Sequence, residues 1–189
     1  KRVPSDFKGA PGFHWNIKHK LLNAEPALDW KDVERVPVTS LPGNWDAFRR
    51  GAVDVAIVSV GAGHTKKLHA GAITDGGIRM LSLNDGIAED RLLKGWPGFK
   101  VITVNPNPRW PSIRKPTRII TFPYMLWTHK DVPNSVVKDV VLALHKHEEV
   151  YKKSSKMVSG FDKNKMNAFT GGVPMHDGAK IAYRILKSN

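Results

Sequence analysis

The clearest pattern in the chain is an almost wholly apolar, β-branched run at residues 53–60 (Val-Asp-Val-Ala-Ile-Val-Ser-Val). Such a run is typical of a strand covered on both faces, as in a parallel sheet. Similar strand patterns precede and follow it, and helical patterns and glycine-containing turns separate them. Strands are predicted at 1–5, 34–39, 53–60, 78–82 and 100–104, and helices at 11–23, 44–51, 64–71 and, with a turn, 86–97. This alternation predicts a doubly wound α/β domain.

The regular alternation changes after Asn84. Residues 105–116 contain four prolines and are predicted to form a loop. Residues 118–129 are extended, but Pro123 lacks the N–H that a strand ladder needs, so this strand is expected at an edge, at a bulge or crossing between domains. A helix from Asp131 to about Lys153 and an amphipathic helix at 178–187 follow. The first of these helices has an apolar stripe of Val136, Val137, Val140, Val141 and Leu144.

The chain is strongly basic. Its 30 lysine and arginine residues against 17 acidic ones give a formal net charge of +13 and a pI near 10.0. Clustered basic residues would fit a nucleic-acid partner, because they neutralise phosphates. Here they are spread along the chain and are densest in predicted helices, which favours a solvated basic surface. The lack of cysteine excludes disulfides and cysteine-ligated metals. The abrupt start on a strand-like segment indicates a processed, trimmed or incomplete chain.

Four segments carry a family resemblance by their order and spacing. They are residues 1–38, where a glycine-rich loop and a helix lead into Val-Pro-Val; 48–56 (Phe-Arg-Arg-Gly-Ala-Val-Asp-Val-Ala); 129–134 (His-Lys-Asp-Val-Pro-Asn); and 173–179 (Val-Pro-Met-His-Asp-Gly-Ala), with Tyr183 after it. Together they resemble the TAXI family, the extracytoplasmic solute receptors of TRAP-type transporters. The resemblance extends over essentially the whole chain.

The resemblance implies a type II periplasmic-binding-protein-like α/β fold. Residues 1–116 would form lobe two, complete and doubly wound, and residues 117–189 would cross the hinge and supply the C-terminal part of lobe one. The family implies a periplasmic receptor, made with a signal peptide, that captures a small organic solute between its lobes and delivers it to membrane transporter subunits. A carboxylate or amino-acid-like solute is expected. The N-terminal part of lobe one has no counterpart here, so a separate fragment or an exchanged dimer is expected to cover the late helices.

Two loops are placed where open α/β lobes bind ligands, beyond strands and at helix amino termini. Candidate ligand-binding residues of the first are Gly12, Phe13, His14 and Trp15. Many family members carry a Gly-Ser-Gly-Thr-like run there, so the rings here suggest a bulkier, flatter or cationic ligand. Candidates of the second are Ser59, Gly61, Ala62, Gly63 and His64. Alternatively, the glycines only make tight turns, and Trp15 points into the core.

The proline-rich loop supplies two further candidates. Arg109 can pair bidentately with a carboxylate, and Trp110 lies where the family often places an aromatic residue over the ligand. The alternative is a solvated, proline-stiffened loop. Tyr124, together with Phe122, either lines the hinge or belongs to the core.

The sequence has no catalytic signature. It lacks a Gly-x-Ser-x-Gly elbow, a Walker loop and a cysteine nucleophile. His14 and His19, like His64 and His69, are five residues apart, unlike a zinc-binding i, i+4 pair. His176 is structural by the resemblance. We expect no enzymatic activity, metal or cofactor, and no nucleic acid. Two alternatives stay open: a receptor that delivers its ligand to a membrane sensor kinase, and a basic nucleic-acid-binding module, which clustering of Lys and Arg on one face would favour.

Overall fold

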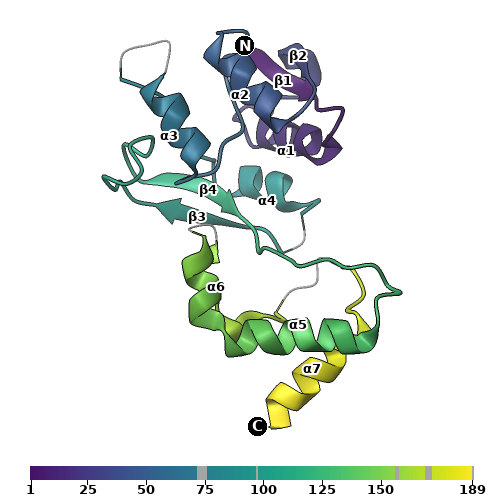
Figure 1. Cartoon of the computed structure of the whole chain (residues 1–189). Coiled ribbons are helices and arrows are strands. Elements are labelled where there is room, and N and C mark those ends of the chain that lie inside the picture. The colour runs from purple at the N-terminus through teal and green to yellow at the C-terminus, as the bar shows by residue number, and fades with distance from the viewer. Residues whose placement is uncertain (72–75, 97, 156–157, 169–171, 189) are drawn as a thin grey trace. The chain divides into compact units, whose positions relative to one another are not determined.

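The computed structural model describes residues 1–71, 76–96, 98–155, 158–168 and 172–188 (Figure 1). The chain divides into two compact units, Lys1–Phe122 and Pro123–Asn189. The first unit combines strands and helices, and the described elements of the second are helical, so the protein has a mixed α/β fold. Sequence analysis places a lobe boundary between residues 116 and 117, whereas Thr117–Thr121 pairs as a strand within the first unit.

The first unit begins with a parallel β–α–β arrangement. β1 (Arg2–Asp6) pairs in parallel with β2 (Glu34–Val38), and α1 (Pro11–Leu22) and the short 3-10 helix η1 (Trp30–Asp32) lie between them in the chain. α2 (Leu41–Arg49) follows and is capped by Ser40, whose Oγ accepts a hydrogen bond from the Gly43 N–H at 3.1 Å. These elements confirm the predictions for this part of the chain. The core consists of Val3, Phe7, Ile17, Val38, Ala47 and Val53.

Residues 53–60, predicted as the central strand, form no strand, and this prediction is wrong. Val53 is buried. The backbone of Ile57, however, forms hydrogen bonds with the side chain of Asn44 and not with a neighbouring strand. Its N–H donates to Asn44 Oδ1, and its C=O accepts from Asn44 Nδ2, both at 3.2 Å. The same carbonyl also accepts from Trp45 Nε1 at 2.8 Å. Side chains of α2 therefore satisfy backbone groups that a neighbouring strand would otherwise pair.

The rest of the first unit contains a second, antiparallel pair. α3 (Gly63–Ala70) and α4 (Ile87–Leu93) precede β3 (Lys100–Val104), which pairs with β4 (Thr117–Thr121). The predictions at 64–71 and 100–104 are confirmed. Residues 78–82 form no strand, and the extended segment 118–129 is a strand only as far as Thr121. Within the described ranges the predicted doubly wound sheet is thus replaced by one parallel and one antiparallel pair.

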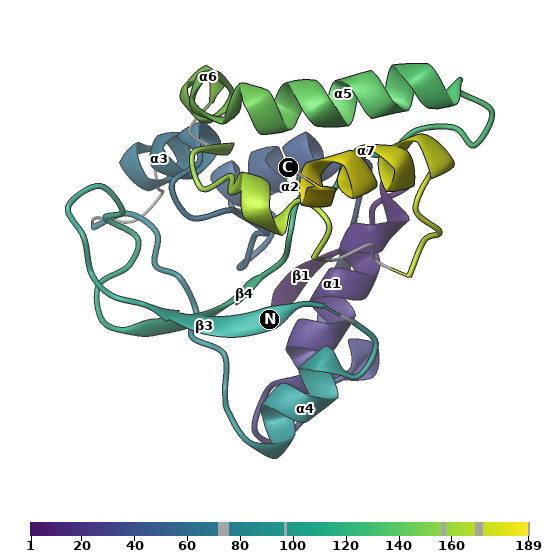
Figure 2. The ribbon, with the colours of Figure 1, turned by 90° about the horizontal axis from the view of Figure 1, so that it is seen from below.

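The described elements of the second unit are α5 (Asn134–Lys146), α6 (Glu148–Ser154), η3 (Lys163–Lys165) and α7 (Asp177–Ser188). The single helix predicted to run to about Lys153 is interrupted at His147, whose backbone leaves helical geometry at φ −107° and ψ 32°. α5 and α7 pack against each other (Figure 1, Figure 2). Of the apolar stripe on α5, Val141 is buried, while Val136 and Val140 are 49% and 40% exposed.

The two packed helices are in close contact at Gly178. A Cβ built there would lie 2.9 Å from the Cβ of Val137 and even closer to the carbonyl oxygen of Asn134. His176 Nδ1 accepts a hydrogen bond from the Gly178 N–H at 3.1 Å and so caps the start of α7. The Pro-x-His-x-Gly-Ala segment therefore has a structural reason for its histidine and its glycine.

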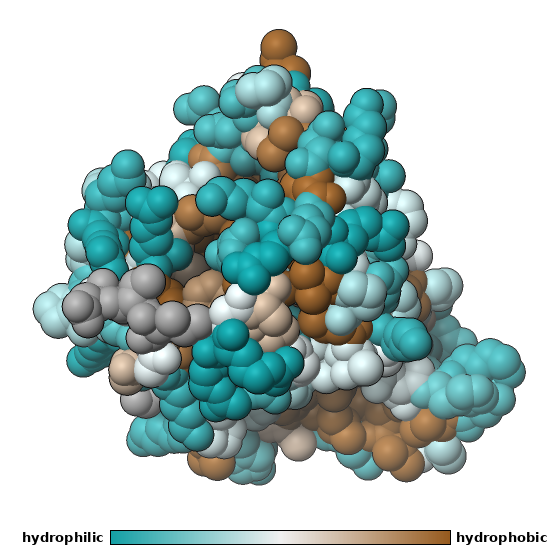
Figure 3. Space-filling view, turned by 90° about the horizontal axis from the view of Figure 1, so that it is seen from above, coloured by the Kyte–Doolittle hydropathy of each residue, from teal (hydrophilic) through white to brown (hydrophobic). Residues whose placement is uncertain are grey.

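The surface mixes polar and apolar residues. Figure 3 shows hydrophilic residues over most of one face, with separate hydrophobic patches between them. Apolar atoms on a protein surface are normal when they are scattered. Large exposed apolar side chains include Trp15, Leu81, Ile87, Leu126 and Trp127.

Candidate functional site

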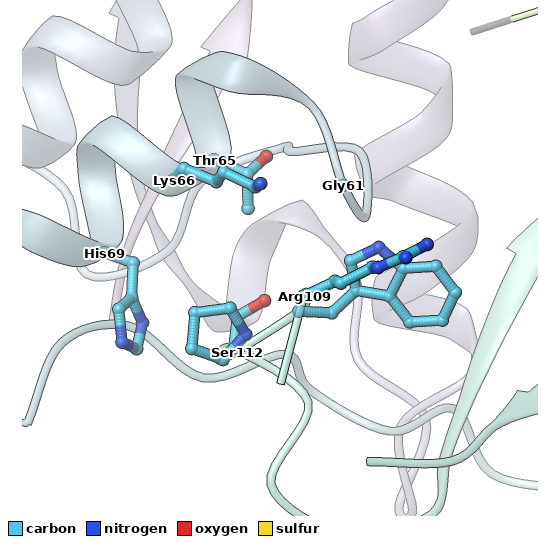
Figure 4. Close-up of a pocket in the computed structure, with 8 residues that line it drawn as sticks. Gly61, Thr65, Lys66, His69, Arg109 and Ser112 are labelled. Carbon is cyan, nitrogen blue, oxygen red and sulfur yellow. The ribbon is translucent and has the colours of Figure 1, made fainter. Parts of the chain in front are cut away.

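The second predicted loop and the proline-rich loop meet at the start of α3. They enclose a small pocket in the first unit (Figure 4). Figure 4 shows Thr65 and Lys66 on one side of it, and Arg109 and Ser112 on the other. The lining residues are Gly61, Thr65, Lys66, His69, Arg109, Trp110, Pro111 and Ser112. The structure therefore joins Gly61 to Arg109 and Trp110, which sequence analysis proposes separately.

The turn into α3 depends on Ser59 and Gly61. The Ser59 carbonyl accepts hydrogen bonds from the Ala62 N–H at 3.2 Å and from Thr65 Oγ1 at 2.7 Å. Gly61 has φ +78°, which favours glycine, and a Cβ there would lie 2.9 Å from Trp110 Nε1. Gly61 therefore makes a tight turn, as the alternative interpretation of the sequence predicts. It also leaves space for the Trp110 indole.

The lining of this pocket favours an anion. Lys66 and Arg109 carry positive charge, and no acidic residue lines the pocket. Neither cation has an ion-pair partner among the described residues. Asn107 Oδ1 accepts the Arg109 N–H at 2.9 Å, which helps to hold the loop. A guanidinium and an ammonium on facing segments can pair with a carboxylate.

The pocket is nearly filled by protein. Its volume is about 10 Å³, which admits about one water molecule. The Trp110 indole lies against Gly61. A ligand larger than a water molecule can enter only if the loop that carries Trp110 moves.

His64 does not line the pocket. Its ring stacks on Trp45 with centroids 3.7 Å apart and planes at 16°. Nε2 is buried and has no hydrogen-bond partner within the described ranges. Burial lowers the pKa of His64 from its ordinary value of 6.5, because the charged ring loses hydration.

We expect His64 to titrate below pH 6.5 in an NMR pH titration of its ring protons. As the pH falls, the unfolded chain binds this proton first. The contribution of His64 to stability is therefore complete above pH 6.5 and is lost as the pH falls through the folded pKa. His64→Phe keeps an aromatic stack and identifies the signal by its loss. A midpoint at or above 6.5 would contradict the burial argument.

The candidates of the first loop lie within α1 and line no part of this pocket. Phe13 packs on Phe7 with ring centroids 5.8 Å apart. His14 stacks on Trp30 at 4.5 Å, and its Nδ1 accepts the Asp6 N–H at 3.1 Å. A Cβ at Gly12 would meet no atom within 4 Å. Phe13 and His14 thus pack α1 against Phe7 and Trp30.

Trp15 and Tyr124 are both on the surface. Trp15 is 58% exposed, so it does not point into the core, and Lys18 Nζ lies 5.9 Å from its ring. Tyr124 belongs to the second unit and is 64% exposed. Phe122, at the end of the first unit, contacts Phe99 with centroids 5.2 Å apart.

Four polar residues of the pocket are not among the candidates predicted from the sequence: Thr65, Lys66, His69 and Ser112. Thr65 and Lys66 follow the Gly61–Gly63 turn in the first turn of α3, and Ser112 stands two residues after Trp110. Extending each motif by one turn would have included these three, whereas His69 lies near the end of α3. Thr65 and Ser112 are almost fully buried, and the Thr65 hydroxyl donates to the Ser59 carbonyl.

The comparisons with known proteins identify no family for this chain. No protein-family model matches the chain, and no curated protein matches it. Among the described residues, no cluster of three or more histidine, aspartate or glutamate side chains could hold a metal ion. No helix in the described part of the chain has the length and apolar character needed to cross a membrane.

Proposed function

We propose that this chain is a periplasmic solute receptor of the TAXI type that serves a TRAP-type transporter. The single observation that carries the proposal is the pocket at the start of α3. It combines Gly61, which is proposed from its place after a predicted strand, with Arg109 and Trp110, whose loop the family resemblance assigns to ligand binding. Its cationic lining suits the carboxylate that such solutes carry.

The arrangement of the chain supports a type II periplasmic-binding-protein-like fold. The β1–α1–β2 unit is parallel, as in the lobes of these receptors, and the candidate site lies where a loop enters a helix. The chain divides into two compact units at residues 122–123. In the proposal, residues 1–116 form lobe two, and the later residues cross a hinge near Tyr124 into lobe one.

The proposed mechanism is reversible capture without covalent chemistry. Trp110 moves off Gly61, and the solute carboxylate takes its place between Lys66 and Arg109. The indole then packs on the solute, as aromatic residues do in many small-molecule sites. Closure of the hinge buries the solute, and the closed form delivers it to the transporter. Delivery to a sensor kinase would use the same pocket.

The test is calorimetric titration with a panel of carboxylates that includes succinate and L-glutamate. We expect Arg109→Gln to weaken binding about tenfold or more, because it removes a charge-assisted hydrogen-bonding group. Arg49→Gln is the matched control, since Arg49 is exposed and pairs with Asp46 on α2. Equal losses in both variants would contradict the site. Binding of an oligonucleotide and of no carboxylate would favour the nucleic-acid alternative.

A further inference from the structure

A second pocket lies in the second unit, among α5, η3 and α7. It is lined by His145, Lys163, Asn164, Asn167, Tyr183 and Lys187, together with Leu186. Its volume is about 190 Å³, which is smaller than the roughly 300–1,000 Å³ of sites for drug-sized ligands. The pocket therefore suits a small ion or a single headgroup, and it is separate from the solute site of the first unit.

The polar side chains that line this pocket can all donate hydrogen bonds. Lys163 and Lys187 line it from different elements, and Asn164 and Asn167 each contribute a side-chain amide. No carboxylate lines it, and neither lysine has an ion-pair partner among the residues that the structure describes. An anion would therefore meet two positive charges and several N–H donors without repulsion.

The acidic residues nearby are engaged elsewhere. Asp162 pairs with Lys165 at 2.8 Å and accepts the Asn164 N–H at 3.0 Å. Its hydrogen bond with Lys165 lowers the pKa of Asp162, so the carboxylate stays charged and bound to that lysine. Glu148 accepts the Lys163 N–H at 3.2 Å, a contact to the backbone that leaves the Lys163 ammonium unpaired.

The wall of the pocket is held in place by Tyr183. Its hydroxyl donates to the Met166 carbonyl at 3.1 Å, which joins α7 to the segment that follows η3. Burial raises the pKa of Tyr183, so the ring stays a neutral phenol and adds no negative charge. Lys163 and Lys187 are therefore carried by two segments that are tied to each other.

We propose that this pocket binds a phosphate group. A phosphate presents several acceptor oxygens and about two negative charges, which match two lysines and two amides better than one carboxylate does. The group could belong to a free phosphate compound or to the headgroup of an anionic phospholipid. The recognising chemistry is the same for both sources.

The test follows inorganic phosphate by ¹H–¹⁵N NMR on the full chain, with Asn164 and Lys187 amides as local reporters. We expect saturable shifts there and a loss of affinity of about tenfold or more in Lys163→Gln/Lys187→Gln. The matched control is Lys138→Gln/Lys180→Gln. It removes the same charge from two helices of the same unit, but these lysines pair with Asp139 and Asp177 and do not line the pocket.

A second arm distinguishes the two sources by flotation with vesicles of phosphatidylglycerol and of phosphatidylcholine. Binding to the anionic vesicles that the first double variant loses and the control keeps indicates a headgroup. Phosphate binding without vesicle binding indicates a free phosphate compound. Absence of shifts at Asn164 and Lys187, or equal losses in both double variants, would overturn the proposal.

Discussion

Replacing Gly178 by alanine will destabilise the second unit by about 3 kcal/mol, the upper part of the range for overpacking a close contact. The new Cβ would lie 2.9 Å from Val137 Cβ and closer still to the Asn134 carbonyl oxygen. Backbone cannot move aside as the end of a flexible side chain can, so α7 must separate from α5. Hydrogen exchange of α5 amides and urea unfolding followed by helical circular dichroism will measure the loss.

Gly160→Ala is the matched control for this prediction, because a Cβ there would meet no atom within 4 Å. We expect it to change the free energy of unfolding by less than about 0.5 kcal/mol. A Gly178→Ala protein with α5 amides as protected as in the parent would show that the two helices do not pack as described. The same result would remove the structural reason for glycine in the Pro-x-His-x-Gly-Ala segment.

The elements that sequence analysis predicts correctly have local causes. Lys100–Val104 is a short β-branched run between Gly98 and Pro106, and it is a strand. Asp177–Ser188 is amphipathic and is a helix. In each case the residues that decide the conformation lie within the element. Hydrophobic periodicity therefore predicts such elements correctly.

The errors have distant causes. The run at 53–60 is apolar enough for a strand, but Asn44 and Trp45 on α2 bind the backbone of Ile57. Of residues 53–60 only Val53 is buried, and periodicity does not report which group pairs with a backbone amide.

The candidate site was predicted in pieces. Gly61 was expected from its place after a predicted strand, and Arg109 and Trp110 from the family resemblance. Their contact arises from folding, because a glycine at φ +78° leaves space for an indole that is remote in sequence. His64 belongs to the same turn but stacks on Trp45. Adjacency in a motif therefore does not determine which side chains line a pocket.

Replacing Asn44 by alanine will cost about 3 kcal/mol, because it leaves the Ile57 N–H without its acceptor and removes two hydrogen bonds. Asn44 is fully buried, so water cannot easily replace the lost amide. The Ile57 carbonyl keeps the Trp45 Nε1–H at 2.8 Å, so the loss falls mainly on the N–H. Urea unfolding gives the free energy, and hydrogen exchange of the Ile57 amide localises it.

Asn107→Ala is the matched control for Asn44→Ala. Asn107 also accepts a backbone hydrogen bond, from the Arg109 N–H, but it is exposed, so water can replace its side chain and we expect a loss below about 1 kcal/mol. Ile57 lies two residues before Ser59, whose carbonyl anchors Thr65 in α3. If the Asn44 amide holds this segment, Asn44→Ala will also speed exchange at the start of α3. A loss of stability with α3 unchanged would mean that Asn44 supports the core and not the pocket.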